Sequence, residues 1–199
     1  MSIIGVQSSG KSTLLNALFS LQCPVSAGRC TRGIYCHLVA VDEESLHTEY
    51  DYLLVVDTEG LRATHLTGKS TFKDNELATF AIGLADATII NMKGESWAEM
   101  KDILQIAAHG LILVRKTKVK LELMPRCMFV HQNVSATYAK EKNLLDQDKH
   151  LSLLDKAIKA AGHAEGFTEI TKFNQVIMIL SHILFIFPTY GMANHRHPE

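Results

Sequence analysis

Short apolar runs alternate along the chain with longer stretches in which hydrophobic residues recur at helical spacing. Leu77, Phe80, Ala81 and Leu84, for example, follow the i, i+3, i+4, i+7 pattern of one helix face. Strands separated by helices usually pair in parallel, because the helix carries the chain back across the sheet. The pattern predicts one α/β domain with a mainly parallel central sheet and helices on both faces. We expect strands at 3–4, 34–41, 52–56, 87–92 and 126–130, and helices at 11–19, 77–84, 97–114 and 143–161.

The longest apolar run extends from Val176 to Phe187 and is interrupted by Ser181 and His182. A membrane-spanning helix needs roughly 20 apolar residues, about twice what this run offers. We therefore expect a core strand or a loop here, and no membrane span.

The composition and net charge limit the kinds of molecule and metal ion that the chain is expected to bind. The chain has 199 residues and a formal net charge of −1, so it suits one domain and has no basic field to attract nucleic acid. Its ten histidines lack the spacing of metal ligands. The cysteines lack it too, and they are too few for a disulfide scaffold. With no signal peptide before the first motif, we expect a cytoplasmic protein, or alternatively a nuclear one. The cysteines are Cys23, Cys30, Cys36 and Cys127.

The segment GVQSSGKST, from Gly5 to Thr13, fits the phosphate-binding pattern G-x-x-x-x-G-K-[ST]. Its glycines let successive backbone N–H groups face one anion, and the following helix points its dipole at the same phosphates. Lys11 places an ammonium against the β and γ phosphate oxygens, and the Ser12 hydroxyl can complete a Mg²⁺ shell. The motif predicts a P-loop nucleoside-triphosphate site with Mg²⁺ as cofactor. Its nucleotide-binding residues are expected to be Gly5, Ser9, Gly10, Lys11, Ser12 and Thr13.

The segment LLVVDTEG, residues 53–60, reads as a buried strand that ends in an acid. Asp57 can deliver its carboxylate to the Mg²⁺ shell, and the N–H group of Gly60 can reach the γ-phosphate. A capping aspartate would explain the pattern equally well if it stood alone. Its position about 45 residues after the P-loop favours the nucleotide role. We assign to the nucleotide site Asp57, Thr58, Glu59 and Gly60.

Thr31 lies in SAGRCTRG, between the first expected helix and the second expected strand. A hydroxyl on a loop at this point can bind Mg²⁺ only when the γ-phosphate is present, which makes a switch ordered by the ligand. The expected Mg²⁺ ligands are therefore Ser12, Thr31 and Asp57.

Five segments together resemble the interferon-induced very large GTPases, relatives of the guanylate-binding proteins in the dynamin superfamily. They are GVQSSGKST, SAGRCTRG, VVDTEGLRA, DNELATF and FVHQNV, and the resemblance extends from about Ile3 to about Phe173. It implies a dynamin-like G domain, GTP and GDP as ligands, and a homodimer or oligomer formed through G domains. We expect this domain over 1–190, with an irregular tail at 191–199 and truncation at both ends.

The resemblance also implies catalytic roles for Gln7, Ser8 and Thr31. Gln7 and Ser8 match a Gln-Ser pair of dynamin P-loops that helps to position the attacking water. Guanylate-binding proteins carry an arginine at the position of Ser8, where it acts as a finger in cis. This chain lacks it. The counter-charge must then come from a cation, from Arg29 or Arg32, or from a partner.

The segment expected to contact the base is His131, Gln132 and Asn133, directly after the strand at 126–130. Guanine recognition in this fold usually relies on an aspartate, and no acid is present here. An asparagine oxygen can accept from guanine, but its amide can equally serve adenine. The preference for GTP over ATP therefore rests on the resemblance.

The expected function is Mg²⁺-dependent GTP hydrolysis that drives a conformational or oligomeric cycle. The alternative is a nucleotide-dependent scaffold or binding module with little hydrolysis, which the missing cis arginine and the unusual base segment favour. A third hypothesis is a truncated product that folds poorly.

Overall fold

The computed structural model describes residues 1–25, 31–41, 50–61, 69–93, 97–118, 124–132 and 139–184. The expected tail at 191–199 lies outside these ranges, and so do Arg29 and Asn133. Six strands and four α-helices are found within them.

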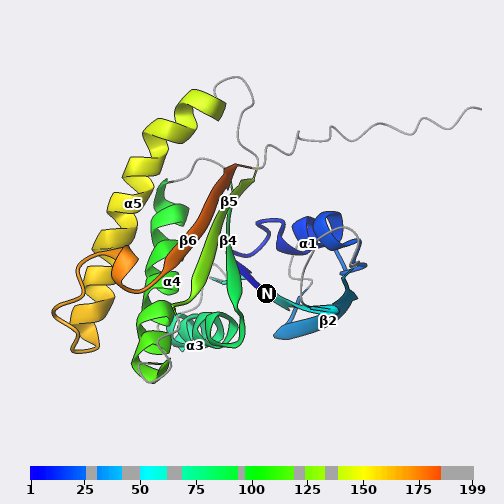
Figure 1. Ribbon diagram of the computed structural model, residues 1–199, viewed down its shortest axis with the longest axis horizontal. Coiled ribbons are helices and arrows are strands. Elements are labelled where there is room, and N and C mark those ends of the chain that lie inside the picture. Colours follow the sequence, from blue (N-terminus) through cyan, green and yellow to red (C-terminus); the bar gives the residue numbers. More distant parts are fainter. Residues whose placement is uncertain are drawn as a thin grey trace, which may run out of the picture.

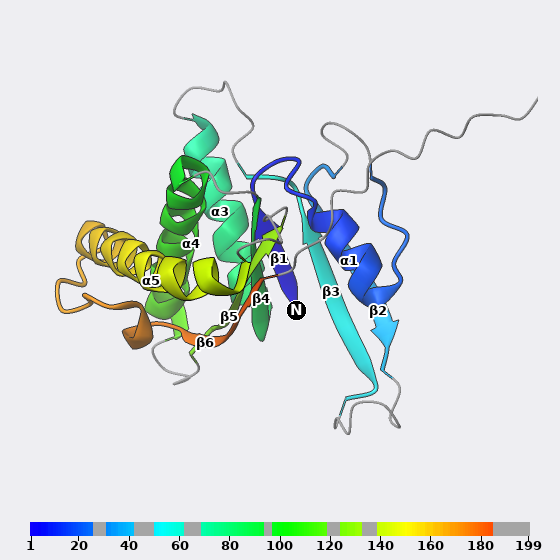
Figure 2. The ribbon, with the colours of Figure 1, turned by 90° about the horizontal axis from the view of Figure 1, so that it is seen from above.

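The strands form one sheet in the order β2-β3-β1-β4-β5-β6 (Figures 1 and 2). Each neighbouring pair is parallel except β2 and β3, which are antiparallel. The prediction of a mainly parallel sheet is thereby confirmed. The strands are β1 (Ser2–Gly5), β2 (Ile34–Ala40), β3 (Tyr52–Thr58), β4 (Ala87–Lys93), β5 (Arg126–Gln132) and β6 (Met178–Leu184).

Helices cover both faces of the sheet, as expected (Figure 2). Helix α1 lies on one face, and α3, α4 and α5 lie on the other. Residues 178–184 of the long apolar run enter the sheet as β6, parallel to β5, so this part of the run takes the strand, one of the two expected alternatives. No helix in the described ranges is long and apolar enough to cross a bilayer. The helices are α1 (Lys11–Phe19), α3 (Lys69–Leu84), α4 (Trp97–Lys118) and α5 (Ala139–Ala164), with a 3₁₀ turn η3 (Phe173–Gln175).

Successive strand residues supply two separate cores, because side chains alternate between the faces of a sheet. Ile3 packs into the core under α1, and its neighbour Ile4 packs into the larger core under α3, α4 and α5. Ile89 and Ile90 divide in the same way. Each fully buried side chain of this kind contributes about 1.5–3 kcal/mol to folding. The central strands are thus held from both sides, and their carboxyl ends make a firm base for the site.

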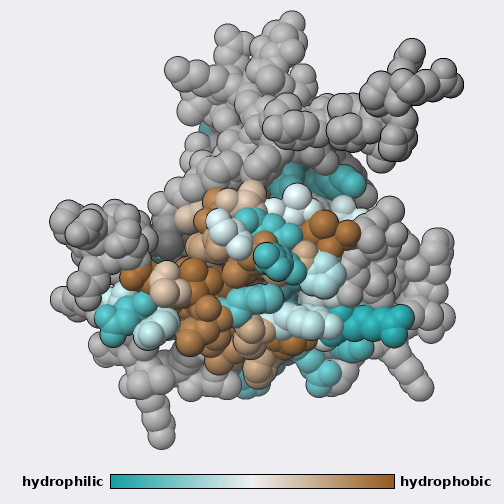
Figure 3. All heavy atoms as spheres, turned by 90° about the vertical axis from the view of Figure 1, so that its right-hand side faces the viewer, coloured by the Kyte–Doolittle hydropathy of each residue, from teal (hydrophilic) through white to brown (hydrophobic). Residues whose placement is uncertain are grey.

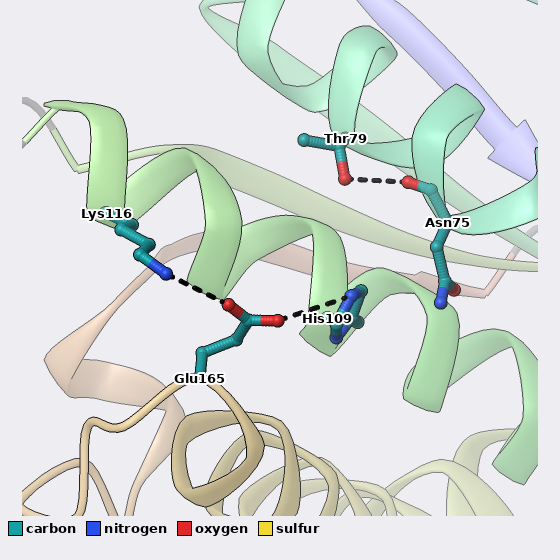
Figure 4. Close-up of polar contacts among 5 residues, drawn as sticks. All are labelled: Asn75, Thr79, His109, Lys116 and Glu165. Carbon is teal, nitrogen blue, oxygen red and sulfur yellow. Dashed lines mark hydrogen bonds and ion pairs between the residues drawn. The ribbon is translucent and has the colours of Figure 1, made fainter. Parts of the chain in front are cut away.

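The end of α5 is tied to α4 by a small polar cluster (Figure 4). Glu165 accepts a hydrogen bond from Lys116 Nζ at 3.2 Å, and its other oxygen lies 3.9 Å from His109 Nε2. Both of these partners of Glu165 belong to α4. Because these groups are partly exposed, each pair contributes less than about 1 kcal/mol. Packing of the helix faces is therefore the main attachment of α5.

The antiparallel pair β2–β3 carries apolar side chains that the described helices leave open to solvent. Leu38 stands opposite Leu54 in the ladder, and the two are 67% and 42% exposed. Tyr35, Tyr52 and Leu18 of α1 are also exposed. Figure 3 faces the side on which α1 and β2 lie in Figure 1 and shows apolar side chains gathered there. Clusters of this kind are typical of surfaces that other polypeptide segments contact.

Candidate nucleotide-binding site

The P-loop is the connection from β1, which ends at Gly5, to α1, which begins at Lys11. A Cβ atom on Gly5 would lie 2.5 Å from the backbone oxygen of Asn91, so only glycine fits beside β4. Gly10 has a φ of +81°, and Ser8 has a φ of 58°. The left-handed region suits glycine and costs a residue such as Ser8 about 1 kcal/mol or more. Both glycines of the motif are thus required by the shape of the turn.

Lys11 lies inside the P-loop turn with its side chain folded back along the loop. Its Nζ donates to the backbone oxygens of Gly5 and Val6 at 3.2 and 3.1 Å. Burial lowers the pKa of the Lys11 ammonium from 10.5 to about 8, although the carboxylates of Asp57 and Glu59 act in the opposite direction. An anion beside Nζ would offset that desolvation, so the position favours phosphate.

The three residues expected to hold Mg²⁺ come together. Ser12 Oγ and Thr31 Oγ1 both donate to Asp57 Oδ2, at 2.8 and 3.2 Å, and the two hydroxyls lie 3.3 Å apart. They come from α1, the segment before β2, and the carboxyl end of β3.

One carboxylate oxygen of Asp57 has no hydrogen-bond partner. The Asp57 side chain is 2% exposed, and Oδ1 is buried without a hydrogen-bond partner. A buried charged acceptor in this state costs several kcal/mol unless a cation or donor faces it. Mg²⁺ is usually held by one or two carboxylates together with hydroxyls, waters and phosphates. The residues present therefore fit Mg²⁺.

Glu59 joins the segment that carries Thr31 to the end of β3. The Gly33 N–H donates to Glu59 Oε2 at 2.9 Å, and the Glu59 N–H donates to the Gly33 carbonyl at 2.7 Å. These two reciprocal bonds hold the start of β2 against the strand that ends in Asp57. Thr31, two residues before Gly33, is thereby kept beside the carboxylate.

The segment after Asp57 runs directly alongside the P-loop. Gln7 N–H donates to the Leu61 carbonyl at 3.1 Å, and Leu61 N–H donates to the Gly5 carbonyl at 3.0 Å. A Cβ atom on Gly60 would overlap the backbone of Gln7, so the two segments touch. Thr58 Oγ1 turns away from this contact and donates to the Ile3 carbonyl at 2.7 Å. Of the expected residues, Gly60 and Gln7 face each other, whereas the Thr58 side chain supports β1.

The remaining P-loop residues differ in exposure. Ser8 and Thr13 are exposed, Gln7 is half-buried, and Ser9 is buried. Arg32 is exposed just before β2. The catalytic roles assigned to Gln7 and Ser8 stay predictions.

Two of the three residues expected at the base lie inside the protein. Gln132 is 6% exposed, and its Nε2 donates to Asn91 Oδ1 at 2.7 Å and to the Gly10 carbonyl at 3.3 Å. The His131 ring stacks on His150 of α5, with ring centroids 4.7 Å apart. Base recognition by this segment stays a prediction, and the contacts of Gln132 point to the P-loop.

Asn91 is a site residue that the sequence reasoning missed. It is fully buried, and its Nδ2 donates to the carbonyl and to the hydroxyl of Ser9, both at 2.9 Å. The only sequence signal is an asparagine within the otherwise apolar run 87–92. A polar side chain inside a buried strand needs partners, and here the P-loop supplies them.

Fold and site together define an α/β P-loop domain of the GTPase type. Residues 1–183 match the family model of the URGCP-like GTPase domain, and the chain belongs to that family. It is 45% identical over 178 residues to interferon-induced very large GTPase 1 of Mus musculus, and equally to that of Homo sapiens. It is 36% identical over 156 residues to up-regulator of cell proliferation of Bos taurus. The family resemblance is thereby confirmed.

The chain is short beside these relatives. The alignments cover 89% and 74% of this chain but only 7% of the murine very large GTPase and 16% of the bovine protein. A similarity of 32% identity over 120 residues to protein SEY1 of Candida glabrata covers 56% of this chain and 15% of that protein. The similarity therefore concerns the P-loop domain alone.

Proposed function

We propose that this domain binds GTP together with Mg²⁺ and hydrolyses it. One observation carries the proposal: Ser12, Thr31 and Asp57 converge beside the P-loop, and a buried carboxylate oxygen there lacks a partner. Three segments far apart in the sequence supply these groups. A capping role for Asp57 would not require two hydroxyls or an unpartnered oxygen.

The chain's own groups suffice to bind a triphosphate. N–H groups at the start of α1 face the phosphates, and Lys11 exchanges its two carbonyl acceptors for phosphate oxygens. Ser12, Thr31 and Asp57 would hold Mg²⁺, which when bound neutralises charge on the β and γ phosphate oxygens. Gln7, whose backbone touches Gly60, would orient a water at the γ-phosphate.

The counter-charge for the reaction must come from elsewhere than the P-loop. Position 8 is Ser8, so no P-loop arginine serves as a finger. We propose that a monovalent cation supplies this charge, in a binding site that a second G domain completes. Arg32 is the alternative source of positive charge within the described residues. The same reasoning supports a homodimer in which two G domains face each other across the bound nucleotide.

A scaffold with little hydrolysis is the second candidate. The absence of an arginine at Ser8 and of an acid in the segment at 131–133 favours it. Multiple-turnover phosphate release at several protein concentrations separates the two functions. Sustained turnover supports hydrolysis, whereas a single bound triphosphate per chain that persists supports the scaffold.

Nucleotide specificity is tested by competition. GTP, ATP and XTP should displace a fluorescent GTP analogue in the order expected for guanine recognition, with GTP strongest. Equal displacement by ATP would contradict the GTP assignment.

For the site of action we propose the cytoplasm or nucleus, where the free thiols of Cys23, Cys36 and Cys127 stay reduced.

A further inference from the structure

Three consecutive carbonyl groups of the P-loop each accept a hydrogen bond from a side chain at the carboxyl end of β4 or β5. Lys93 Nζ donates to the Ser8 oxygen at 3.3 Å, and Asn91 Nδ2 donates to the Ser9 oxygen at 2.9 Å. Gln132 Nε2 donates to the Gly10 oxygen at 3.3 Å. The loop is therefore held from the sheet side along its whole second half.

Asn91 and Gln132 form one closed network. Asn91 uses its amide donors on the carbonyl and hydroxyl of Ser9, and its oxygen accepts from Gln132 at 2.7 Å. Gln132 thereby commits its Nε2 donors to Asn91 and to Gly10. Both side chains are more than nine-tenths buried. Buried networks with satisfied donors are rigid, because any rotation would leave a polar group without a partner.

Fixing these carbonyls also fixes N–H groups. The C=O of one residue and the N–H of the next lie in one peptide plane and point in opposite directions. The Ser9 carbonyl is turned toward Asn91, and the Gly10 carbonyl accepts both from Gln132 and from the Leu14 N–H of α1, at 2.9 Å. The N–H groups of Gly10 and Lys11 therefore point the opposite way, to the phosphate side. The Ser9 N–H donates to the Val6 carbonyl at 3.3 Å and closes the turn. A row of outward N–H groups is the anion-binding element of a P-loop.

We propose that Asn91 and Gln132 are positioning residues that hold the Gly10 and Lys11 N–H groups toward the phosphates. Gln132 acts on the P-loop and does not read the base. The proposal rests on the phosphate-binding role of the P-loop in the proposed function, but it does not depend on guanine being the base. Without the network, the Ser9–Gly10 peptide, which lies between the left-handed residues Ser8 and Gly10, would lose the bond from Asn91, and the Gly10 carbonyl would keep only its bond from the Leu14 N–H.

The base-reading role is the competing explanation for Gln132. A residue that reads a base needs a donor or acceptor directed at the ligand. The Nε2 donors of Gln132 are used inside the protein, and its Oε1 lies 2.7 Å from the place of a Cβ atom on Gly10. Close seating against the P-loop favours the positioning role.

The test uses a ligand without a base. Wild type, Gln132→Met and Gln132→Asn are compared for displacement of a fluorescent GTP analogue by GTP, GDP and inorganic tripolyphosphate. Methionine keeps the chain length without a donor, and asparagine keeps the amide but is one methylene too short to reach both partners. We expect each variant to weaken all three ligands by the same factor, about 3- to 10-fold for one or two lost hydrogen bonds.

A matched control separates positioning from loss of stability. Thr88 Oγ1 and Ser2 Oγ share a buried hydrogen bond of 3.0 Å at the other end of β4. Thr88→Val removes it without touching the P-loop, so it should lower the melting temperature and leave all three affinities unchanged. Equal affinity losses in Thr88→Val and Gln132→Met would overturn the positioning role.

The two remaining outcomes are also decisive. If Gln132→Met weakens GTP and GDP but not tripolyphosphate, Gln132 reads the base and the proposal is wrong. If the wild-type domain prefers another nucleotide, the assignment to GTP is wrong. In that case, an equal loss of affinity for tripolyphosphate and for nucleotides in the Gln132 variants would still support the positioning role.

Discussion

Ser12 and Asp57, 45 positions apart, are joined by a hydrogen bond of 2.8 Å between Ser12 Oγ and Asp57 Oδ2. The bond connects the first turn of α1 to the carboxyl end of β3 and leaves Asp57 Oδ1 without a partner. It places a hydroxyl and a carboxylate where a divalent cation beside a P-loop triphosphate requires them. Predictions about metal, phosphate and switch follow from this pair and its neighbours.

Replacing Lys11 by alanine should abolish tight triphosphate binding and leave the fold intact. The loss of a charge-assisted contact to phosphate costs about 1.5–3 kcal/mol or more. The measurement is the affinity for a fluorescent GTP analogue, with circular dichroism as the check on folding. Lys116→Ala removes an equal charge at an exposed position and should bind normally. Unchanged affinity in a folded Lys11→Ala domain would refute the assignment of the site.

Asp57→Asn and Thr31→Ala should weaken triphosphate binding more than diphosphate binding in Mg²⁺. Both groups are expected to contact the metal that bridges the β and γ phosphates. Affinities for GTP and GDP, each with Mg²⁺ and with EDTA, give the comparison. If a variant weakens the binding of GTP and of GDP by the same factor, the proposed metal role is wrong.

Asp57→Asn has a second consequence of opposite sign. In the ligand-free domain it removes a buried charge whose Oδ1 has no partner, so at about pH 9, where Lys11 is largely neutral and gains little from the carboxylate, it should raise the melting temperature. Added Mg²⁺ and GTP should stabilise the wild type more than the variant. A variant that melts lower than the wild type in EDTA would argue against an unmet charge at Asp57.

Triphosphate binding should be coupled to proton uptake at alkaline pH through Lys11. Burial lowers the pKa of the ligand-free ammonium to about 8, so this group is largely neutral between pH 8 and 10.5, while the unfolded chain keeps its proton. The free energy of unfolding should therefore rise with pH across this window. Phosphate favours the charged form and raises the pKa again.

The proton uptake is measured by titration calorimetry at about pH 9 in buffers of different ionisation enthalpy. The observed binding enthalpy should depend on the buffer at this pH and lose that dependence well below the pKa of Lys11. Lys11→Arg keeps its charge throughout and is the control. Buffer-independent enthalpies in the wild type would contradict the lowered pKa.

Glu59→Ala should loosen the segment that carries Thr31. It removes the acceptor of the Gly33 N–H, a bond of 2.9 Å, whose net contribution is about 1 kcal/mol. Amide hydrogen exchange at the start of β2 should become about 5-fold faster. Glu59→Gln keeps an oxygen at this position and should exchange more like the wild type. Identical exchange in the alanine variant would show that the bond does not hold the switch segment.

Sequence patterns predicted the parts of this molecule that depend on local periodicity. Helix α1 occupies the expected residues 11–19, because its cap, its apolar face and the P-loop all lie next to one another in the chain. Helix α3 begins at Lys69, eight positions before the apolar stripe at Leu77, because Phe72 is the one apolar residue of its first two turns and leaves no periodic signal. Polar helix ends of this kind are visible only once a fold provides their surroundings.

The proximity of Ser12, Thr31 and Asp57 could be anticipated because each lies in or beside a recognisable sequence motif, and their role as metal ligands stays a prediction. Asn91 could not be anticipated, because its role depends on β4 lying beside β1, a pairing between residues far apart in the sequence. The sequence places Gln132 directly after the expected strand at 126–130 and so predicts contact with the base, whereas Gln132 is the last residue of β5 and its hydrogen bonds reach Asn91 and Gly10. Side-chain direction at the end of a strand is set by tertiary packing, which a single sequence does not display.

The last prediction concerns how hydrolysis is stimulated. Ser8 occupies the place of a cis arginine, so an isolated monomer should turn over slowly. The negative charge that develops on the transferring phosphoryl group still requires a counter-charge, worth roughly 10³–10⁵ in rate where an arginine finger provides it. Dynamin P-loops share the Gln-Ser pair at Gln7. By analogy with them, a monovalent cation between two facing G domains would supply this counter-charge.

Specific activity should then rise with protein concentration and fall when K⁺ or Na⁺ is replaced by a bulky organic cation. A transition-state mimic of GTP should shift the domain to a dimer in light scattering. We expect the segment 26–33 to lie near that interface, since Thr31 is itself an expected Mg²⁺ ligand and the neighbouring Arg32 is exposed. Turnover by a strict monomer, independent of both concentration and cation, would instead point to an arginine of the same chain. Arg32→Ala and Arg29→Ala would then identify it, because the responsible variant alone should lose most of the remaining rate.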